Sequence, residues 1–344
     1  MKKFMAYNLL KRLRFFLSGG LPGTSRYEKK QLQLQQNFER YQVLAQSEKM
    51  QRYNELAAQV ATPRKQSGLS KKEWKQIKQD FSTLQKSQEI SQFFKLQKQS
   101  KNFKEIAAWK EVFFDNFNAP ALDASKWVTR CPTATEALPH ITYTQAEECH
   151  LFTDGNNVQS TGETVQVLTQ KEPTTGIVFS KELGFIPAER NFTSGIVNTD
   201  EKYRVQYGKI EAKIKFQSTS KYVFHAVWMA AGGQLPHINL LRIGQNIEMS
   251  SFAKSDRGTL QYVDLWGKIL RQNTFYIIQL LWNEDKITWS INGRPMFSAP
   301  NTIHQPLFLS FSSGILGGEP RTELPSTLTV DWVKVSQPQT PQEH

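Results

Sequence analysis

The stretch that decides the fold is Trp282-Asn283-Glu284-Asp285-Lys286-Ile287-Thr288-Trp289-Ser290-Ile291-Asn292-Gly293. Polar and apolar side chains alternate from Lys286 to Ile291, as they do along a strand with one buried face. The run before the Asn-Glu-Asp turn, Phe275–Trp282, is rich in aromatic and β-branched residues, which favour strands. The stretch therefore predicts two strands separated by a short turn.

Segments of the same kind recur on both sides of this stretch, from Phe113 to Gln337. Short runs rich in Val, Ile, Thr, Phe and Tyr are separated by Gly, Asn, Asp and Pro. The other strands that we expect are Val165–Thr169, Ile177–Ser180, Gly208–Phe216, Phe224–Met229, His237–Ile243, Pro306–Phe311 and Leu328–Val335. Repeated short strands over such a length indicate two packed sheets in a jelly-roll sandwich.

Charge separates this β-rich part from the residues before it. The chain has 344 residues, which is long enough for two domains with a core each. Residues 1–110 hold 23 Lys and Arg against 8 Asp and Glu, whereas the remainder holds 20 against 23. The whole excess of the +12 net charge therefore belongs to the first part. We expect a leader helix with a Gly/Pro linker at 1–25, a helical region at 26–110, the sandwich at 111–338 and a tail at 339–344.

The basic region is predicted to be helical from about residue 26 to residue 60, with further helices after the breaks at Pro63 and Gly68. Ser70 and Glu73 have the spacing of a capping box at a helix start. The apolar stripe that indicates the first helix consists of Leu34, Phe38, Tyr41 and Ala45. Because the aromatic residues fall on such stripes, they are expected to fill a core, and nucleic-acid binding is not expected. A hairpin or coiled-coil-like arrangement that spaces or assembles the second domain fits better.

The leader has the pattern of a basic amphipathic helix over residues 3–17. Its cations Lys3, Lys11, Arg12 and Arg14 lie on the arc opposite the apolar one. The apolar arc consists of Met5, Ala6, Leu9, Leu10, Leu13, Phe16 and Leu17. Such a helix lies on an anionic membrane surface, docks into a partner or packs on its own protein, and the sequence leaves all three open.

Export and membrane insertion are not indicated. The cations of the leader interrupt its apolar runs and no Ala-x-Ala-like cleavage site follows, so we expect a cytoplasmic or particle-associated protein rather than a secreted one. No run of 18 apolar residues indicates a membrane span. The two cysteines, Cys131 and Cys149, match no metal site, and the sequence leaves open whether they form a disulfide.

Five segments, in order, resemble family-16 glycoside hydrolases of the laminarinase type. They are Phe114–Asn118 with Leu122–Trp127, Thr193–Gly195 with Tyr207–Lys215, His225–Met229, Trp282–Gly293 and Val330–Val335. The resemblance implies a concanavalin A-like jelly roll. The expected fold class is therefore α + β multidomain, with an N-terminal helical region followed by an all-β sandwich. It also implies a retaining glycosidase that acts on a polysaccharide.

The catalytic strand of the resembling family reads Glu-x-Asp-x-x-Glu, and residues 236–244 stand in its place as Pro-His-Ile-Asn-Leu-Leu-Arg-Ile-Gly. The resemblance puts His237 in the nucleophile slot, Asn239 in the assisting aspartate slot and Arg242 in the acid/base slot. It also implies a β-bulge that returns the last side chain to the cleft. An amide does not ionise and a guanidinium stays protonated, so neither can replace a carboxylate. We therefore expect that the retaining chemistry is lost.

The chain resembles a glycosidase family but lacks the carboxylates of its catalytic strand, and three functions are compatible with this. The first is glycan binding without cleavage, in which positive charge in the groove would suit an acidic sugar. The candidate glycan-binding residues are Trp266, Trp228, Tyr222, His225, Arg242 and His237. The second is a scaffold that the helical region assembles with a protein partner. The third is a glycosidase with relocated acids, for which Glu248 and Asp264 are the candidates. No cofactor is expected; relatives carry calcium on the convex face, but the sequence assigns no ligands.

Overall fold

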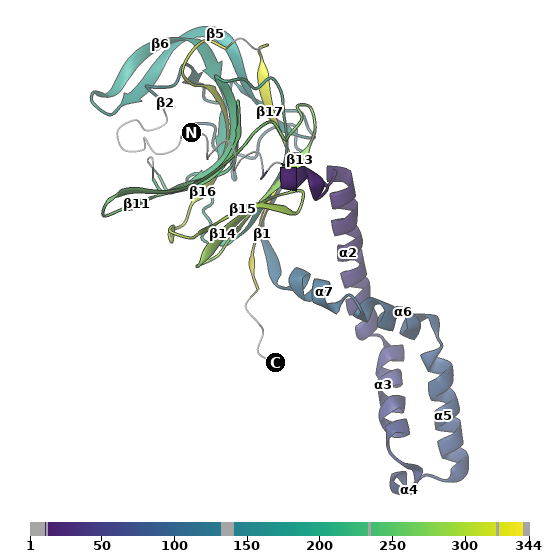
Figure 1. Cartoon of the computed structure of the whole chain (residues 1–344). Helices are drawn as coiled ribbons and strands as arrows, with labels where there is room; N and C mark the ends of the chain where they lie inside the picture. Colours follow the sequence, from purple (N-terminus) through teal and green to yellow (C-terminus); the bar gives the residue numbers. More distant parts are fainter. Residues whose placement is uncertain (1–10, 12, 132–140, 233–234, 321–322, 340–344) are drawn as a thin grey trace. The chain divides into compact units, whose positions relative to one another are not determined.

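The computed structural model describes residues 11, 13–131, 141–232, 235–320 and 323–339. These residues form two compact units. One unit joins the described residues before Ser25 to Glu111–Gln337, and the other joins Ser25–Lys110 to the residues that follow Gln337. Helices come first and a β-sandwich follows (Figure 1), which confirms the predicted fold class.

The helical unit is built from six helices. They are α2 (Thr24–Ala45), α3 (Glu48–Ala61), α4 (Arg64–Ser67), α5 (Lys71–Gln85), α6 (Gln88–Gln97) and α7 (Ser100–Ala107). The helix predicted over 26–60 is interrupted between Ala45 and Glu48, because the Ser47 hydroxyl accepts a hydrogen bond from the Met50 amide and caps a new helix. The capping box of Ser70 and Glu73 is present as predicted.

Aromatic side chains fill the core of the helical unit, as the stripe pattern predicts. Figure 1 shows α3 and α5 side by side, and the rings of Tyr53 and Phe81 stack between them with centroids 5.2 Å apart. Tyr41 of α2 stacks on Phe93 of α6 at 5.0 Å. The last residue of the predicted stripe is wrong by one position, since Leu44 is buried and Ala45 is exposed.

The sandwich consists of two sheets. The 11-stranded sheet has the order β15-β14-β13-β8-β17-β5-β6-β3, with β1, β2 and β4 attached to it, and the six-stranded sheet has the order β12-β11-β10-β9-β16-β7. The strands of the larger sheet are β1 (Trp109–Asp115), β2 (Thr144–Gln145), β3 (Leu151–Phe152), β4 (Val158–Ser160), β5 (Val165–Ser180), β6 (Gly184–Ser194), β8 (Gly208–Phe216), β13 (Tyr276–Trp282), β14 (Lys286–Ile291), β15 (Arg294–Pro300) and β17 (Ser326–Pro338). Those of the smaller sheet are β7 (Ile196–Asn198), β9 (Val223–Ala230), β10 (His237–Ile243), β11 (Ile247–Ser255), β12 (Gly258–Trp266) and β16 (Phe308–Ile315).

Most predicted strands are present, and the predicted bounds of β8, β10 and β14 are those of the structure. The segments predicted at Val165–Thr169 and Ile177–Ser180 are two ends of one strand, β5, whose register shifts between Lys171 and Thr174. The strands that the prediction missed include β11, which pairs with β10, and β12, which pairs with β11 at the edge of the smaller sheet.

The core lies between the sheets, and the opposite face of the smaller sheet carries the candidate site. Along β10 the side chains of Ile238, Leu240 and Leu241 are buried in the core, whereas His237 and Arg242 are partly exposed on the other face. Register shifts against both β9 and β11 fall between Asn239 and Arg242, which confirms the predicted bulge. Without the extra residue, strict alternation would turn Arg242 toward the core.

The leader is docked on the sandwich, and the side chain of Phe15 is buried in the contact. Phe15 is only 5% exposed, with its ring centroid 5.1 Å from that of Trp266 on β12. The Arg294 guanidinium of β15 lies 4.3 Å from the Phe15 ring centre on the other side, and it also donates to the Ser18 and Gly20 carbonyls. The leader therefore contacts the edge strands of both sheets. Met5, Ala6, Leu9 and Leu10 of the predicted apolar arc lie outside the described residues.

The described residues show the state of the two cysteines and whether any helix could span a membrane. Cys131 and Cys149 are free thiols. No helix in the described part of the chain combines the length and the apolar character needed to cross a bilayer.

Candidate functional site

A groove of about 480 Å³ lies on the open face of the smaller sheet. Its floor comes from β9, β10, β11 and β16, and the segment from Tyr143 to Phe152 forms one wall. The lining includes six aromatic side chains, those of Tyr143, Phe152, Phe224, Trp228, Phe252 and Phe308. A groove of this size with aromatic walls and a few polar groups suits a small ligand or a segment of a polymer.

The polar groups on the groove floor are bonded to one another. His237 Nε2 and Asn239 Oδ1 are 2.8 Å apart, and the Asn239 amide donates to Glu248 Oε1 at 3.1 Å and to Ser250 Oγ at 2.9 Å. The Ser250 hydroxyl donates to the same Glu248 oxygen at 2.7 Å. Burial lowers the pKa of His237, so its imidazole is neutral at pH 7. The nucleophile and aspartate slots therefore hold two uncharged side chains that support a carboxylate of the next strand.

Arg242, in the third slot, is also held in place. Its guanidinium lies 4.4 Å from the centre of the Phe224 ring, and its strand partner on β11 is Glu248. A cation that stacks on an aromatic face and lies beside a carboxylate is oriented and partly neutralised. The slot therefore offers fixed donors to a ligand and does not offer a proton that can shuttle.

Glu148 is a groove residue that the sequence analysis missed. It lies on the wall opposite β11, where its carboxylate accepts a hydrogen bond from the Gln145 amide. Burial raises the pKa of Glu148 to about 7, although the Gln145 amide and the charge of Arg242 act in the opposite direction. Glu148 stands in a turn 100 positions before Glu248, and no spacing pattern links the two. The groove thus contains two carboxyl groups, those of Glu148 and Glu248. Neither lies at the positions that the family pattern assigns to its carboxylates.

Of the other predicted site residues, Trp228 and Glu248 line the groove. The Trp228 ring is partly exposed, stacks on His237 with centroids 5.1 Å apart and donates from Nε1 to Ser312 Oγ. It therefore contributes to the groove wall and is not a core residue.

Four predicted site residues lie elsewhere. Trp266 is buried in the core beneath the leader, so its prediction as a glycan-binding residue is wrong. Asp264 shares that face of β12, where it bonds to Lys11 and to Trp266 Nε1, so it is no partner for Glu248 in the groove. His225 is fully buried and points between the sheets to Ser326 and the Gln217 carbonyl. Tyr222 packs beside Gly318 and is not among the residues that line the groove.

The described residues offer no evident metal centre, because they contain no group of three or more His, Cys, Asp or Glu that could hold an ion. Cys131 lines the groove, but burial raises the pKa of its thiol, which keeps it protonated and unreactive at neutral pH.

Comparison with known proteins agrees with this architecture. A sequence profile described as "Glycosyl hydrolases family 16" matches residues 146–334. "Glucan endo-1,3-beta-glucosidase A1" of Niallia circulans is 22% identical over 276 residues, which are 67% of this chain and 38% of that protein. The chain thus spans well under half the length of this curated relative.

Solved structures show the same fold. The laminarinase catalytic domain of Thermotoga maritima superposes with a TM-score of 0.53 at 18% identity, over 67% of this chain and 99% of that one. The kappa-carrageenase of Pseudoalteromonas carrageenovora superposes with a TM-score of 0.53 at 16% identity, over 66% of this chain and 94% of that one. These identities are low enough that the likeness is one of fold.

Proposed function

The chain belongs to glycosyl hydrolase family 16, and from that premise we propose that its groove binds a polysaccharide without cleaving it. The observation that supports this is the content of β10: His237, Asn239 and Arg242 face the groove where the family pattern has three carboxylates. Retaining hydrolysis needs one carboxylate as nucleophile and another as acid, about 5 Å apart. Binding needs only the aromatic walls and oriented donors that the groove contains.

A neutral glycan fits this groove better than an acidic one. Arg242 faces Glu248 in the strand register, and its charge also acts on Glu148. Two carboxyl groups therefore accompany one guanidinium, so the groove has no surplus of positive charge for a sulfated or carboxylated sugar. Relatives with this fold include proteins described as endo-1,3-β-glucanases, which is consistent with a β-glucan as the ligand.

Affinity electrophoresis of the full chain tests this proposal. Gels would contain a β-1,3-glucan, a mixed-linkage glucan, agarose or κ-carrageenan, and reducing ends would be measured in parallel incubations. We expect retarded migration in a neutral glucan without release of reducing ends. Arg242→Ala should weaken binding about tenfold, because oriented donors contribute roughly 1–3 kcal/mol each.

The matched control is Arg257→Ala, which removes an exposed guanidinium from the β11–β12 turn and should leave binding unchanged. Normal migration of the wild-type chain in every gel would contradict glycan binding. Equal weakening by both arginine variants would mean that the retardation is a general charge effect and not binding in the groove.

A second candidate function is hydrolysis by relocated acids, which Glu148 specifically favours. A carboxyl group with a pKa of about 7 is suited to donate a proton at neutral pH, and Glu248 is a second carboxyl group in the same groove. On this alternative, wild-type protein releases reducing ends from a glucan, and both Glu148→Gln and Glu248→Gln abolish the release. Activity that survives both substitutions would exclude this pair.

A further inference from the structure

The docked part of the leader has two unlike faces. Lys11, Phe15 and Ser18 point to the sandwich: Lys11 pairs with Asp264 and lies 4.1 Å from the centre of the Trp266 ring, Phe15 is buried, and Ser18 bonds to Arg294. These three positions follow the i, i+4, i+7 spacing of one helix face. The sandwich thus binds the leader by this face and fixes which face points away.

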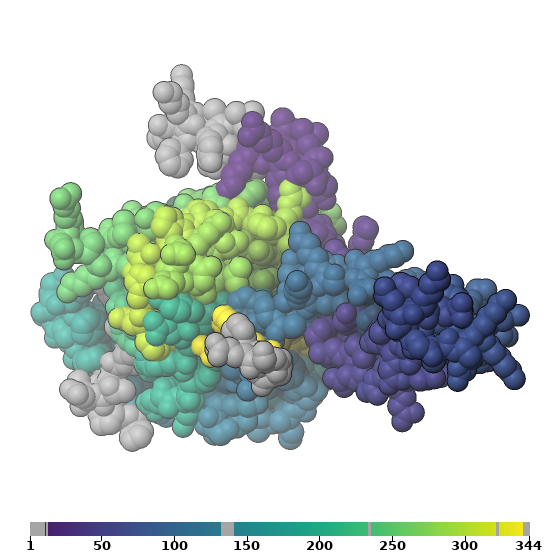
Figure 2. Space-filling view, turned by 90° about the horizontal axis from the view of Figure 1, so that it is seen from below, coloured from purple at the N-terminus to yellow at the C-terminus, as the bar shows by residue number. Residues whose placement is uncertain are grey.

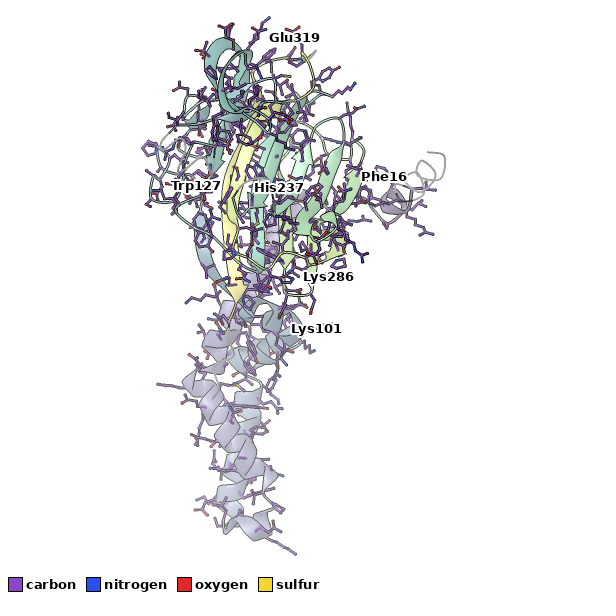
Figure 3. All side chains as sticks on the ribbon, turned by 90° about the vertical axis from the view of Figure 1, so that its left-hand side faces the viewer. Phe16, Lys101, Trp127, His237, Lys286 and Glu319 are labelled. Atoms are coloured by element: carbon purple, nitrogen blue, oxygen red, sulfur yellow. The ribbon has the colours of Figure 1, made fainter. Side chains whose placement is uncertain are left out.

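The opposite face of the same helix is apolar and exposed. Leu13 is 55% exposed, Phe16 61% and Leu17 78%, and the three occupy positions i, i+3 and i+4. In Figure 3 Phe16 lies at the margin of the sandwich, away from His237. In Figure 2 the leader, in purple, stands out from the green surface of the sandwich strands. Monomeric proteins rarely present adjacent large apolar side chains in this way unless the patch binds something.

The described cations near this apolar face include Arg14 and Lys268, and the sequence of the leader is basic. The sequence has five Lys and Arg among its first 17 residues and no acidic residue before Glu28. Arg14 is exposed between the apolar positions, and exposed Lys268 borders the same surface hollow as Phe16. Asp264, an acidic residue that contacts the leader, is paired with Lys11. A basic helix with an apolar face is the usual form of a segment that inserts into the headgroup region of an anionic bilayer.

From these contacts we propose that the leader is a peripheral membrane anchor. Leu13, Phe16 and Leu17 enter the surface of an anionic lipid bilayer while Phe15 holds the helix to the sandwich. The occupant is a lipid surface rather than a protein groove, because a headgroup layer complements both the exposed cations and the apolar side chains between them. The proposal is independent of what the groove binds.

Vesicle flotation of the full chain tests the proposal. One set of vesicles is phosphatidylcholine alone, and the other is three parts phosphatidylcholine to one part phosphatidylserine. We expect flotation with the second set only, and less of it as salt is raised, because salt screens surface attraction. The double variant Phe16→Ser with Leu17→Ser should bind at least about tenfold more weakly, since two large apolar side chains no longer leave water.

The matched control is Leu183→Ser at the tip of the β5–β6 hairpin, which removes a leucine that is 70% exposed from another surface. It should float like the wild-type chain. All the substituted side chains are exposed, so circular dichroism melting should be unchanged in every variant. Flotation that the double variant retains, or no flotation of the wild-type chain with either vesicle set, would overturn the proposal; the second result would leave a protein groove as the partner of this face.

Discussion

At the scale of single residues, Asn239 and Glu248 form a matched pair. The amide of Asn239 donates to Glu248 and to Ser250, and the indole of Trp289 donates to the Asn239 carbonyl from the other sheet. A carboxylate at position 239 would put two acceptors where one donor and one acceptor now meet. The amide at position 239 is therefore matched to the carboxylate of Glu248 on β11.

Asn239→Asp should destabilise the sandwich by about 1–3 kcal/mol at pH 7, because the partly buried contact with Glu248 becomes repulsive. Chemical denaturation at pH 7 and at pH 5 measures the effect, which should shrink at the lower pH as one carboxyl group takes up a proton. Adding Glu248→Gln restores a donor opposite the new carboxylate, so the double variant should recover most of the loss. A double variant as unstable as the single one would show that the two residues are not coupled.

At the scale of elements, the leader shows how two neighbouring phenylalanines take opposite roles. Phe15 fills a site between Trp266 and Arg294, whereas Phe16 is exposed. Phe15→Ala should therefore lower the free energy of unfolding by about 2 kcal/mol, through lost burial of the ring. Phe16→Ala is the matched control and should change it by less than about 0.5 kcal/mol. Equal effects of the two substitutions in thermal melts would mean that the leader is not docked by Phe15.

The elements also show what could be predicted from the sequence. Strand spacing together with the family pattern predicts β8, β10, β14 and the bulge, because these depend on local alternation and on one ordered motif. Alternation along β9 already puts His225 and Trp228 on opposite faces, because they are three positions apart, so the prediction that both bind a glycan was wrong for one of them. The structure shows which one: His225 is buried between the sheets and Trp228 lines the groove. Trp266 was misplaced because β12 was not recognised as a strand.

Long-range contacts account for the remaining errors in the candidate site. Glu148 reaches the groove from a turn that pairs with Leu316, and nothing near Glu148 in the sequence indicates that neighbour. The helical pattern of the leader indicates an apolar arc, but the face that docks is chosen by Trp266 and Arg294, far along the chain. The sequence pattern therefore predicts the apolar arc of the leader helix, but it does not predict that this arc is exposed.

At the scale of the whole molecule, buried titratable groups determine how stability depends on pH. His150 and His225 are fully buried, and burial lowers the pKa of each to about 4. An unfolded histidine binds a proton below a pH of about 6.5, so the unfolded chain binds more protons than the folded one between these values. Stability is therefore lost as pH falls through this window. Glu148 acts in the opposite sense, because its pKa is raised to about 7 in the folded chain.

His150 and His225 together outweigh Glu148, and the lowered pKa of His237 acts in the same direction as theirs. The free energy of unfolding should therefore fall by at least about 2 kcal/mol from pH 7 to pH 5. Urea denaturation at intervals of pH measures this slope. Glu148→Gln removes the opposing contribution, so its stability should fall more steeply over the same range. A variant with a slope equal to or shallower than that of the wild-type chain would contradict a raised pKa for Glu148.

The docking of the leader has a consequence for the order of events during synthesis. Lys11 contacts a residue 253 positions later, and Ser18 contacts one 276 positions later. A ribosome makes the N-terminus first, at roughly 5–20 residues per second, so the leader waits for tens of seconds before β12 and β15 exist. Throughout that interval Phe15 has no partner on the sandwich, because Trp266 and Arg294 have not yet been made. A binding partner of the leader in the cell can therefore contact it before the sandwich has folded.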